Sequence, residues 1–215
     1  MPDLSTNEVL ALAIAISFAA GLNLSAVLVT LGLLSQAGIL ALPGPIAIVG
    51  EWWVIITASV LFTVEFFADK VPAFDLVWNA LLTFIRVPAG AVLAFAATDA
   101  LSPGMQVLAA IAGGGVTLAA HGAKLALRST ASTSPEPFSN VGLSLMEDVA
   151  AVGLTWFAVE YPFIAAAIVL VLVALTILLI RWVWLAARAL FRGAARQWSN
   201  RTSDGPPLPP TTAAR

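Results

Sequence analysis

Long apolar stretches separated by short polar connections constrain this chain more than any other feature. Of its residues, 60% are hydrophobic and only 10% are charged, whereas a soluble domain carries about 25% charged residues. A hydrocarbon core about 30 Å thick is crossed by about 20 apolar residues in a helix. The sequence therefore predicts an all-α fold, in which several membrane-spanning helices form a polytopic bundle.

Six segments meet or approach the length that is needed to cross a bilayer. The fifth is interrupted by the adjacent carboxylates Glu147 and Asp148, so it is the weakest of the six and is either short, tilted or partly re-entrant. The spans place a membrane domain over residues 1–198, and the Pro-, Ser- and Thr-rich residues 199–215 predict a disordered tail. The predicted spans are Val9–Leu34, Ile46–Phe67, Leu76–Ala97, Met105–Leu127, Val141–Ala158 and Tyr161–Leu190.

Basic residues lie on one predicted side of the membrane. The connections between spans one and two, three and four, and five and six contain no Lys or Arg, whereas the segment from Arg181 onward is rich in Arg. Because basic residues are retained on the cytoplasmic side, we expect both termini in the cytoplasm. The same segment spaces Arg188, Arg192 and Arg196 four residues apart near tryptophans, and this pattern predicts contact with anionic lipid.

Composition argues against several functional classes. The chain has no cysteine, so neither a disulfide nor a thiolate metal site can form. A net charge of −2 gives no indication of nucleic-acid binding. The motifs of serine hydrolases, zinc proteases and phosphate-binding loops are missing. We therefore expect neither an enzyme, nor a metal site, nor another cofactor.

The two halves of the chain share a pattern of prolines and charges. The Pro-x-Pro of residues 43–45 recurs at residues 135–137, and Glu65 and Arg86 have counterparts in Glu160 and Arg181. Two halves of three spans each must have opposite orientations. The pattern therefore predicts a 3+3 inverted repeat of residues 9–97 and 105–190, an architecture used by secondary transporters. Chance similarity between apolar segments is the alternative.

The densest group of polar residues lies between spans four and five. Its first members, His121 and Lys124, share one helix face, and a run of hydroxyl residues and the second Pro-x-Pro follow. A cationic helix end facing the cytoplasm would explain the basic residues alone, but ionisable groups at membrane depth are typical of functional sites. The candidate ligands for a small ion or polar solute in this region are His121, Lys124, Ser134, Glu136, Asn140, Glu147 and Asp148.

Arg86 is the main candidate in the first half. It falls near the middle of the third span, where an unpaired arginine is costly, so we predict a carboxylate partner among Glu65, Glu147 and Asp148. Pro88, two residues further on, should loosen the same helix.

The adjacent carboxylates Glu147 and Asp148 point about 100° apart on a helix. One of them can therefore pair with Arg86 or Lys124 while the other lines a cavity. Ser139 or Asn140 is the candidate N-cap of the fifth span, and Asp75 is that of the third. The secondary candidates are Asn23 and Thr117, which either bridge the first and fourth spans or contact a solute, together with Asp69 and Asp75.

Several of these stretches resemble domain-of-unknown-function family 4126 (DUF4126), a family of small, mainly bacterial membrane proteins. The resemblance covers about residues 10–180 and implies a polytopic fold in the bacterial inner membrane, with no assigned activity and no catalytic residue. It rests on Gly21-Leu22-Asn23, residues 69–78, residues 83–90, His121-x-x-Lys124, residues 132–140 and Glu147-Asp148.

Two functions fit these features. The first is a transporter or channel for a small ion or polar solute, with His121, Glu147 or Asp148 as a proton-linked group. The second is a non-transporting scaffold or lipid-binding protein, for which the basic, Trp-rich last helix is the evidence. Because six spans are few for a complete pathway, we also expect a homodimer.

Overall fold

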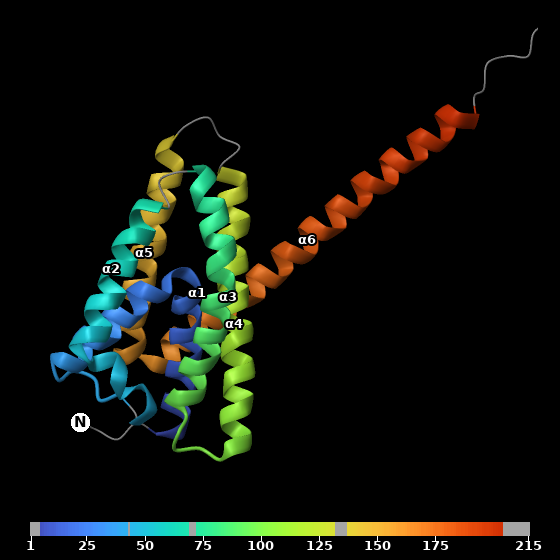
Figure 1. Cartoon of the computed structure of the whole chain (residues 1–215). Coiled ribbons are helices and arrows are strands. Elements are labelled where there is room, and N and C mark those ends of the chain that lie inside the picture. Colours follow the sequence, from blue (N-terminus) through green and yellow to red (C-terminus); the bar gives the residue numbers. More distant parts are fainter. Residues whose placement is uncertain (1–4, 43, 69–71, 132–136, 204–215) are drawn as a thin grey trace, which may run out of the picture. The chain divides into compact units, whose positions relative to one another are not determined.

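The computed structural model describes residues 5–42, 44–68, 72–131 and 137–203. In these ranges the chain forms helices and short connections without any strand, which confirms the all-α prediction (Figure 1). Residues up to Thr176 form one compact unit, and residues from Ile177 onward form a second. The elements are α1 (Thr6–Gln36), the 3₁₀ helix η1 (Gly44–Gly50), α2 (Trp52–Ala68), α3 (Pro72–Ala97), α4 (Pro103–Ala131), α5 (Pro137–Glu160) and α6 (Pro162–Ser203).

The first helix, α1, is the centre of the first unit. It packs against η1, α2, α3, α4 and α5, and Figure 1 shows its blue ribbon among those of the other helices. Its buried face is rich in alanine, and Ala15, Ala19 and Ala20 are fully buried. Small side chains let neighbouring backbones approach closely, which is how helices associate in lipid.

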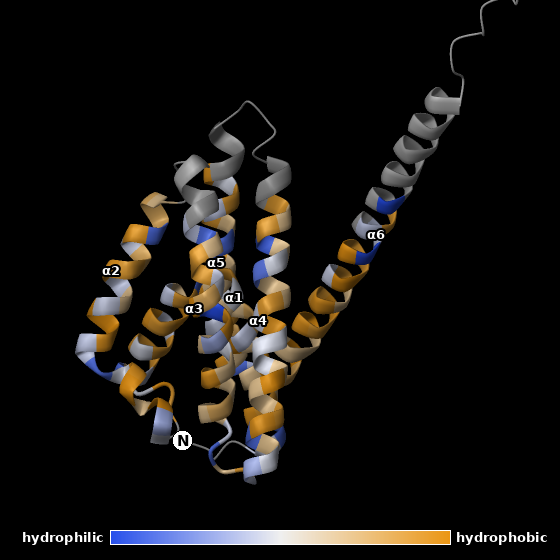
Figure 2. Ribbon diagram, turned by 45° about the vertical axis from the view of Figure 1, so that its right-hand side comes forward, coloured by the Kyte–Doolittle hydropathy of each residue, from blue (hydrophilic) through white to orange (hydrophobic). Residues whose placement is uncertain are grey.

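The helices are long and apolar enough to cross a membrane several times. Five of those described meet this requirement alone, and the bent pair of η1 and α2 makes up to six. Figure 2 shows that their ribbons are mainly hydrophobic, with hydrophilic positions interspersed. The chain is therefore a polytopic membrane protein. The fifth predicted span is one continuous helix, α5, in which Val141–Glu160 has the length and hydropathy of a full crossing.

The bend instead occurs in the second predicted span, where η1 and α2 meet at 64°. The carbonyl of Gly50 accepts a hydrogen bond from Gln36 Nε2 at 2.7 Å. The N–H of Val54, which would bond to that carbonyl in a continuous helix, donates to the backbone carbonyl of Glu51 at 2.9 Å. The helix therefore cannot continue through Gly50 with its usual bonding. The prediction of an unbroken helix over Ile46–Phe67 was wrong for this reason.

The helix starts also differ from the sequence prediction. Both α3 and α5 begin at a proline, Pro72 and Pro137, because proline suits the first turn of a helix, where its missing N–H is not needed. Asp75, Ser139 and Asn140 are therefore inside these helices, and the prediction of N-caps at these residues was wrong. Pro88 also lies inside the continuous α3.

The matched charges of the two halves have different surroundings. Glu65 and Arg86 are buried, whereas Glu160 and Arg181 are exposed. The inverted repeat stays a prediction. Helix α6 runs to Ser203, and the remainder of the predicted tail, residues 204–215, lies outside the described residues.

Glycines set the distance between α1, α3 and α4. A Cβ atom on Gly113 of α4 would collide with Ala94 Cβ of α3 and would lie 2.8 Å from Ser17 Oγ of α1. A Cβ atom on Gly90 of α3 would overlap the side chain of Thr117. These helices are therefore packed as closely as their backbones allow.

We expect Gly113→Ala to destabilise the protein by about 1–3 kcal/mol, because an extra methyl group has no space between the three helices. The matched control is Gly115→Ala on the same helix, since nothing lies within 4 Å of its Cβ position. The measurement is the midpoint of thermal unfolding in detergent. Equal midpoints for the two variants would contradict the close packing.

Candidate functional site

Helix α1 is broken at Asn23. This residue has φ −151° and ψ 103°, which is an extended conformation inside a helix. Its side-chain Oδ1 accepts a hydrogen bond from the N–H of Ala26 at 3.0 Å, as an N-cap does. Asn23 thus ends one half-helix and begins the next. The sequence prediction of an unbroken first span missed this break, although a polar residue beside Gly21 in an otherwise apolar run was a signal for it.

The break leaves a backbone carbonyl without its usual helical partner. In a continuous helix the N–H of Ala26 would bond to the carbonyl of Leu22, but here it bonds to the Asn23 side chain. The ammonium of Lys124, from α4, donates to the Leu22 carbonyl at 3.2 Å. The cation therefore satisfies a group that would otherwise be costly to bury.

The two adjacent carboxylates of α5 diverge, as their helical spacing predicted. Glu147 Oε2 lies 3.2 Å from Lys124 Nζ, so the prediction that one carboxylate pairs with Lys124 or Arg86 is confirmed. Asp148 Oδ1 accepts a hydrogen bond from Asn23 Nδ2 at 2.8 Å. Helix α5 is thereby joined to α4 through one carboxylate and to the break in α1 through the other.

Arg86 has the carboxylate partner that its depth predicted. Its Nη2 forms an ion pair with Glu65 Oε1 of α2, and the two residues are 1% and 3% exposed. Glu65 Oε1 also lies 3.9 Å from Lys124 Nζ. Glu65, one of the three predicted partners, therefore lies near both buried cations.

The ring of His121 lies between donors and acceptors that fix its proton. Arg86 Nη1 is 3.1 Å from His121 Nδ1, and because arginine can only donate, Nδ1 must accept. The other nitrogen, Nε2, is 3.1 Å from the Asn79 carbonyl and 2.8 Å from Thr83 Oγ1. The proton is therefore on Nε2 and the imidazole is neutral. Asn79 and Thr83 were not among the predicted site residues, although they lie seven and three residues before Arg86 and therefore share its helix face.

These contacts define a buried polar cluster that joins α1, α2, α3, α4 and α5. Each member is at most 7% exposed. Its described members include three carboxylates and two cations, and the ion pairs join Glu65 and Glu147 to those cations. A charge at membrane depth costs about 2.5–3.5 kcal/mol on insertion scales, which explains why these charges are gathered together. The members are Asn23, Glu65, Asn79, Arg86, His121, Lys124, Glu147 and Asp148.

One further predicted candidate, Thr117, is described by the structure and is not a member of this cluster. Thr117 bridges α4 and α1, because its hydroxyl donates to the Ser17 carbonyl at 2.8 Å, so the bridging alternative is confirmed for this residue. Ser134, Glu136 and Asp69 lie outside the described residues, as do the side chains of Asn140 and Asp75.

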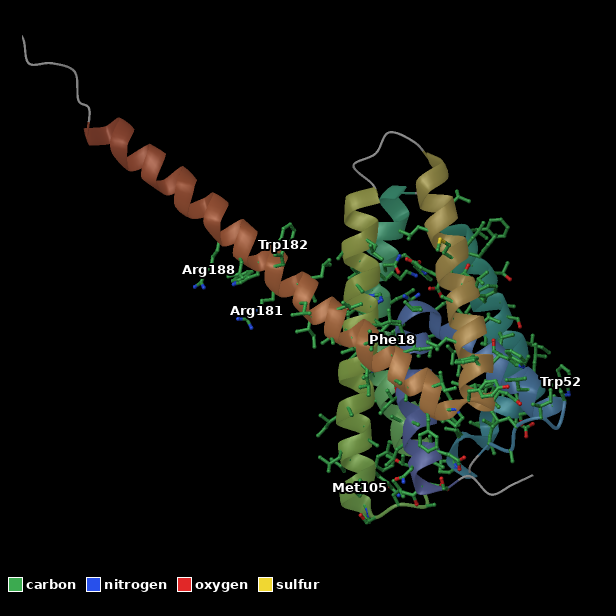
Figure 3. All side chains as sticks on the ribbon, turned by 180° about the vertical axis from the view of Figure 1, so that it is seen from behind. Phe18, Trp52, Met105, Arg181, Trp182 and Arg188 are labelled. Atoms are coloured by element: carbon green, nitrogen blue, oxygen red, sulfur yellow. The ribbon has the colours of Figure 1, made fainter. Side chains whose placement is uncertain are left out.

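Two apolar cavities lie away from the cluster. One, of about 190 Å³, is lined by residues of α1, α3 and α4 that include Met105. The other, of about 520 Å³, lies between α1 and α2 and includes Trp52. Figure 3 labels both residues. The linings of these two cavities contain no member of the polar cluster.

The model of the domain of unknown function DUF4126 matches residues 10–182. The chain belongs to this family. The whole polar cluster lies within the DUF4126 segment, and the earlier resemblance is confirmed. No curated protein and no solved structure matches the chain.

We expect Arg86→Met to destabilise the protein by about 3–5 kcal/mol, because Glu65 would remain buried without its main counter-charge. The double variant Glu65→Leu/Arg86→Met should recover much of this loss, since no carboxylate is then left there. The thermal midpoint in detergent measures both. The control is Glu51→Gln, an exposed carboxylate, which should change stability by less than about 0.5 kcal/mol. If Arg86→Met behaves like this control, the pair does not hold α2 to α3.

Proposed function

We propose that this DUF4126 protein is a transporter or channel for a small ion or polar solute, and that movement of the solute is coupled to a proton or small cation. The observation that carries the proposal is the polar cluster gathered at the break in α1. Ionisable groups at membrane depth are characteristic of ion pathways and proton relays. Broken helices with freed backbone carbonyls form substrate and ion sites in secondary transporters.

The charge of the cluster supports coupling to a positive charge. With His121 neutral, the described carboxylates Glu65, Glu147 and Asp148 exceed the cations Arg86 and Lys124 by one. Burying a surplus charge in a membrane is unfavourable. Uptake of one proton or one small monovalent cation would balance this surplus among the described members of the cluster.

His121 links such a proton to the ion pairs around it. A second proton on Nδ1 would face Arg86 Nη1, and two donors cannot share a hydrogen bond. Arg86 would then have to move, and it carries the pair with Glu65 on α2. The other charged groups of the cluster are Lys124 on the same helix as His121, and Glu147 and Asp148 on α5. Protonation of one ring thus alters contacts between three helices.

The proposal places the protein in the bacterial inner membrane, and the basic C-terminal segment supports an orientation with both termini in the cytoplasm. This orientation follows from the absence of Lys and Arg in the predicted outer connections. A homodimer is part of the same proposal, since five or six helices are few for a complete pathway.

We expect proteoliposomes of the purified protein to give transient currents on solid-supported membranes after a pH jump or a NaCl jump. Glu147→Gln and Asp148→Asn should each reduce the peak current at least about tenfold, equivalent to about 1.4 kcal/mol. The matched control is Glu160→Gln, an exposed carboxylate at the end of the same helix, which should retain the current. Currents that are absent in every case, or unchanged by both substitutions, would refute the proposal.

A second candidate function is a non-transporting scaffold that binds anionic lipid. The observation that favours it is the second unit, in which Arg181, Trp182, Trp184 and Arg188 are all exposed on α6; Figure 3 labels three of them. Tryptophan and arginine together are typical of contact with headgroups.

For this candidate, we expect brominated phosphatidylglycerol to quench tryptophan fluorescence more strongly than brominated phosphatidylcholine. Arg181→Gln and Arg188→Gln should each weaken the preference for the anionic lipid about fivefold, since each basic residue near the surface contributes about 1 kcal/mol. The lysine variants at the same positions retain the charge and serve as controls. Equal quenching by the two lipids in the original protein would exclude this role.

A further inference from the structure

The ammonium of Lys124 lies in a shell of oxygen atoms that come from three other helices. Leu22 of α1 contributes a backbone carbonyl at 3.2 Å. Glu147 of α5 contributes Oε2 at 3.2 Å, and Glu65 of α2 contributes Oε1 at 3.9 Å. Lys124 is 1% exposed, so its charge is balanced by this shell and not by bulk water.

The chemistry of this shell is that of a site for a hard cation. Carboxylate and carbonyl oxygens are the ligands that such cations prefer in proteins. A carbonyl freed by a helix break is a recurring ligand for monovalent cations in membrane proteins. Here the freed carbonyl exists because the Asn23 side chain has taken the N–H of Ala26.

We propose that the oxygens of Leu22, Glu65 and Glu147 form a binding site for a monovalent cation, in which the Lys124 ammonium is the built-in occupant. A free potassium or sodium ion binds in the same place when that ammonium is removed. The inference does not depend on transport, because it concerns equilibrium binding only.

The charge count strengthens this assignment. Without the Lys124 charge, the three carboxylates among the described members of the cluster would face one described cation, Arg86. A shell that is buried and that negative has a strong electrostatic preference for a replacement cation. Potassium is close to ammonium in size, so it is the first probe, and sodium is the second. Choline carries the same charge but is too large for the space of one ammonium group.

The test is the thermal midpoint of Lys124→Ala in detergent, measured in KCl, NaCl and choline chloride at equal ionic strength. We expect KCl or NaCl to raise the midpoint of this variant by at least about 2–4 °C relative to choline chloride. The original protein should show a clearly smaller difference, because Lys124 fills this site. Isothermal titration of the variant with the better of the two salts should give saturable binding.

Two controls separate this site from general salt effects. In Lys124→Ala/Glu147→Gln one ligand has lost its charge, and the difference between the salts should shrink or vanish. Arg181→Ala removes an exposed cation and should show no difference between the salts.

A second variant keeps the proposal testable if Lys124→Ala does not fold. If Lys124→Ala is not recovered in choline chloride, Lys124→Gln is purified in parallel in each salt, and recovery in KCl or NaCl alone would support the site. Equal midpoints of a folded variant in all three salts would overturn the proposal, and so would failure of both variants in every salt. Because no transport is measured, a missing current in proteoliposomes leaves this result unaffected.

Discussion

The arrangement of the first unit depends on one requirement, that a backbone polar group buried in an apolar medium must find a partner. Asn23 breaks the central helix, and the oxygen and nitrogen of its side chain form hydrogen bonds to different partners. The oxygen caps the following half-helix, and the nitrogen reaches Asp148 on α5. The carbonyl left by the break draws Lys124 inward from α4. Lys124 in turn brings Glu147 and Glu65 close together. A single deviation from helical geometry thus accounts for a cluster that joins five helices.

Much of this fold could be predicted from the sequence, because the bilayer leaves few alternatives. Long apolar runs can satisfy their backbones in lipid only as helices or closed barrels, and the length of each run gave the spans. The burial cost of an arginine near mid-span was enough to predict a carboxylate partner, and Glu65 was among the three named. The helical spacing of Glu147 and Asp148 predicted that they would diverge. Each of these predictions rests on a general property of helices or of charges in a membrane. None of them requires knowledge of which helices pack together.

The parts that were missed depend on contacts between residues far apart in the chain. The break at Asn23 is favourable because Asp148 and Lys124 lie beside it, and no local pattern contains that information. The bend before α2 depends on Gln36, a side chain that reaches the Gly50 carbonyl from α1. Asn79 and Thr83 gain their importance from His121 on another helix. The helix starts at Pro72 and Pro137, in contrast, are set by the local sequence. There the preference of proline for the first turn of a helix outweighed that of the candidate N-caps.

The helices of this unit are joined in two different ways. Glycines hold α3 and α4 in close contact with α1, while α2 meets α3 and α5 meets α4 over sparse packing in which ion pairs provide the attraction. Such attraction depends on how little water is present. Two unit charges 4 Å apart attract by roughly 4 kcal/mol at an effective dielectric constant of about 20, but by only about 1 kcal/mol in water. Entry of water between α2 and α3, or between α4 and α5, would therefore weaken the ion-pair attraction that holds the two helices together. Separation of the helices would in turn admit more water, so the two changes would reinforce each other.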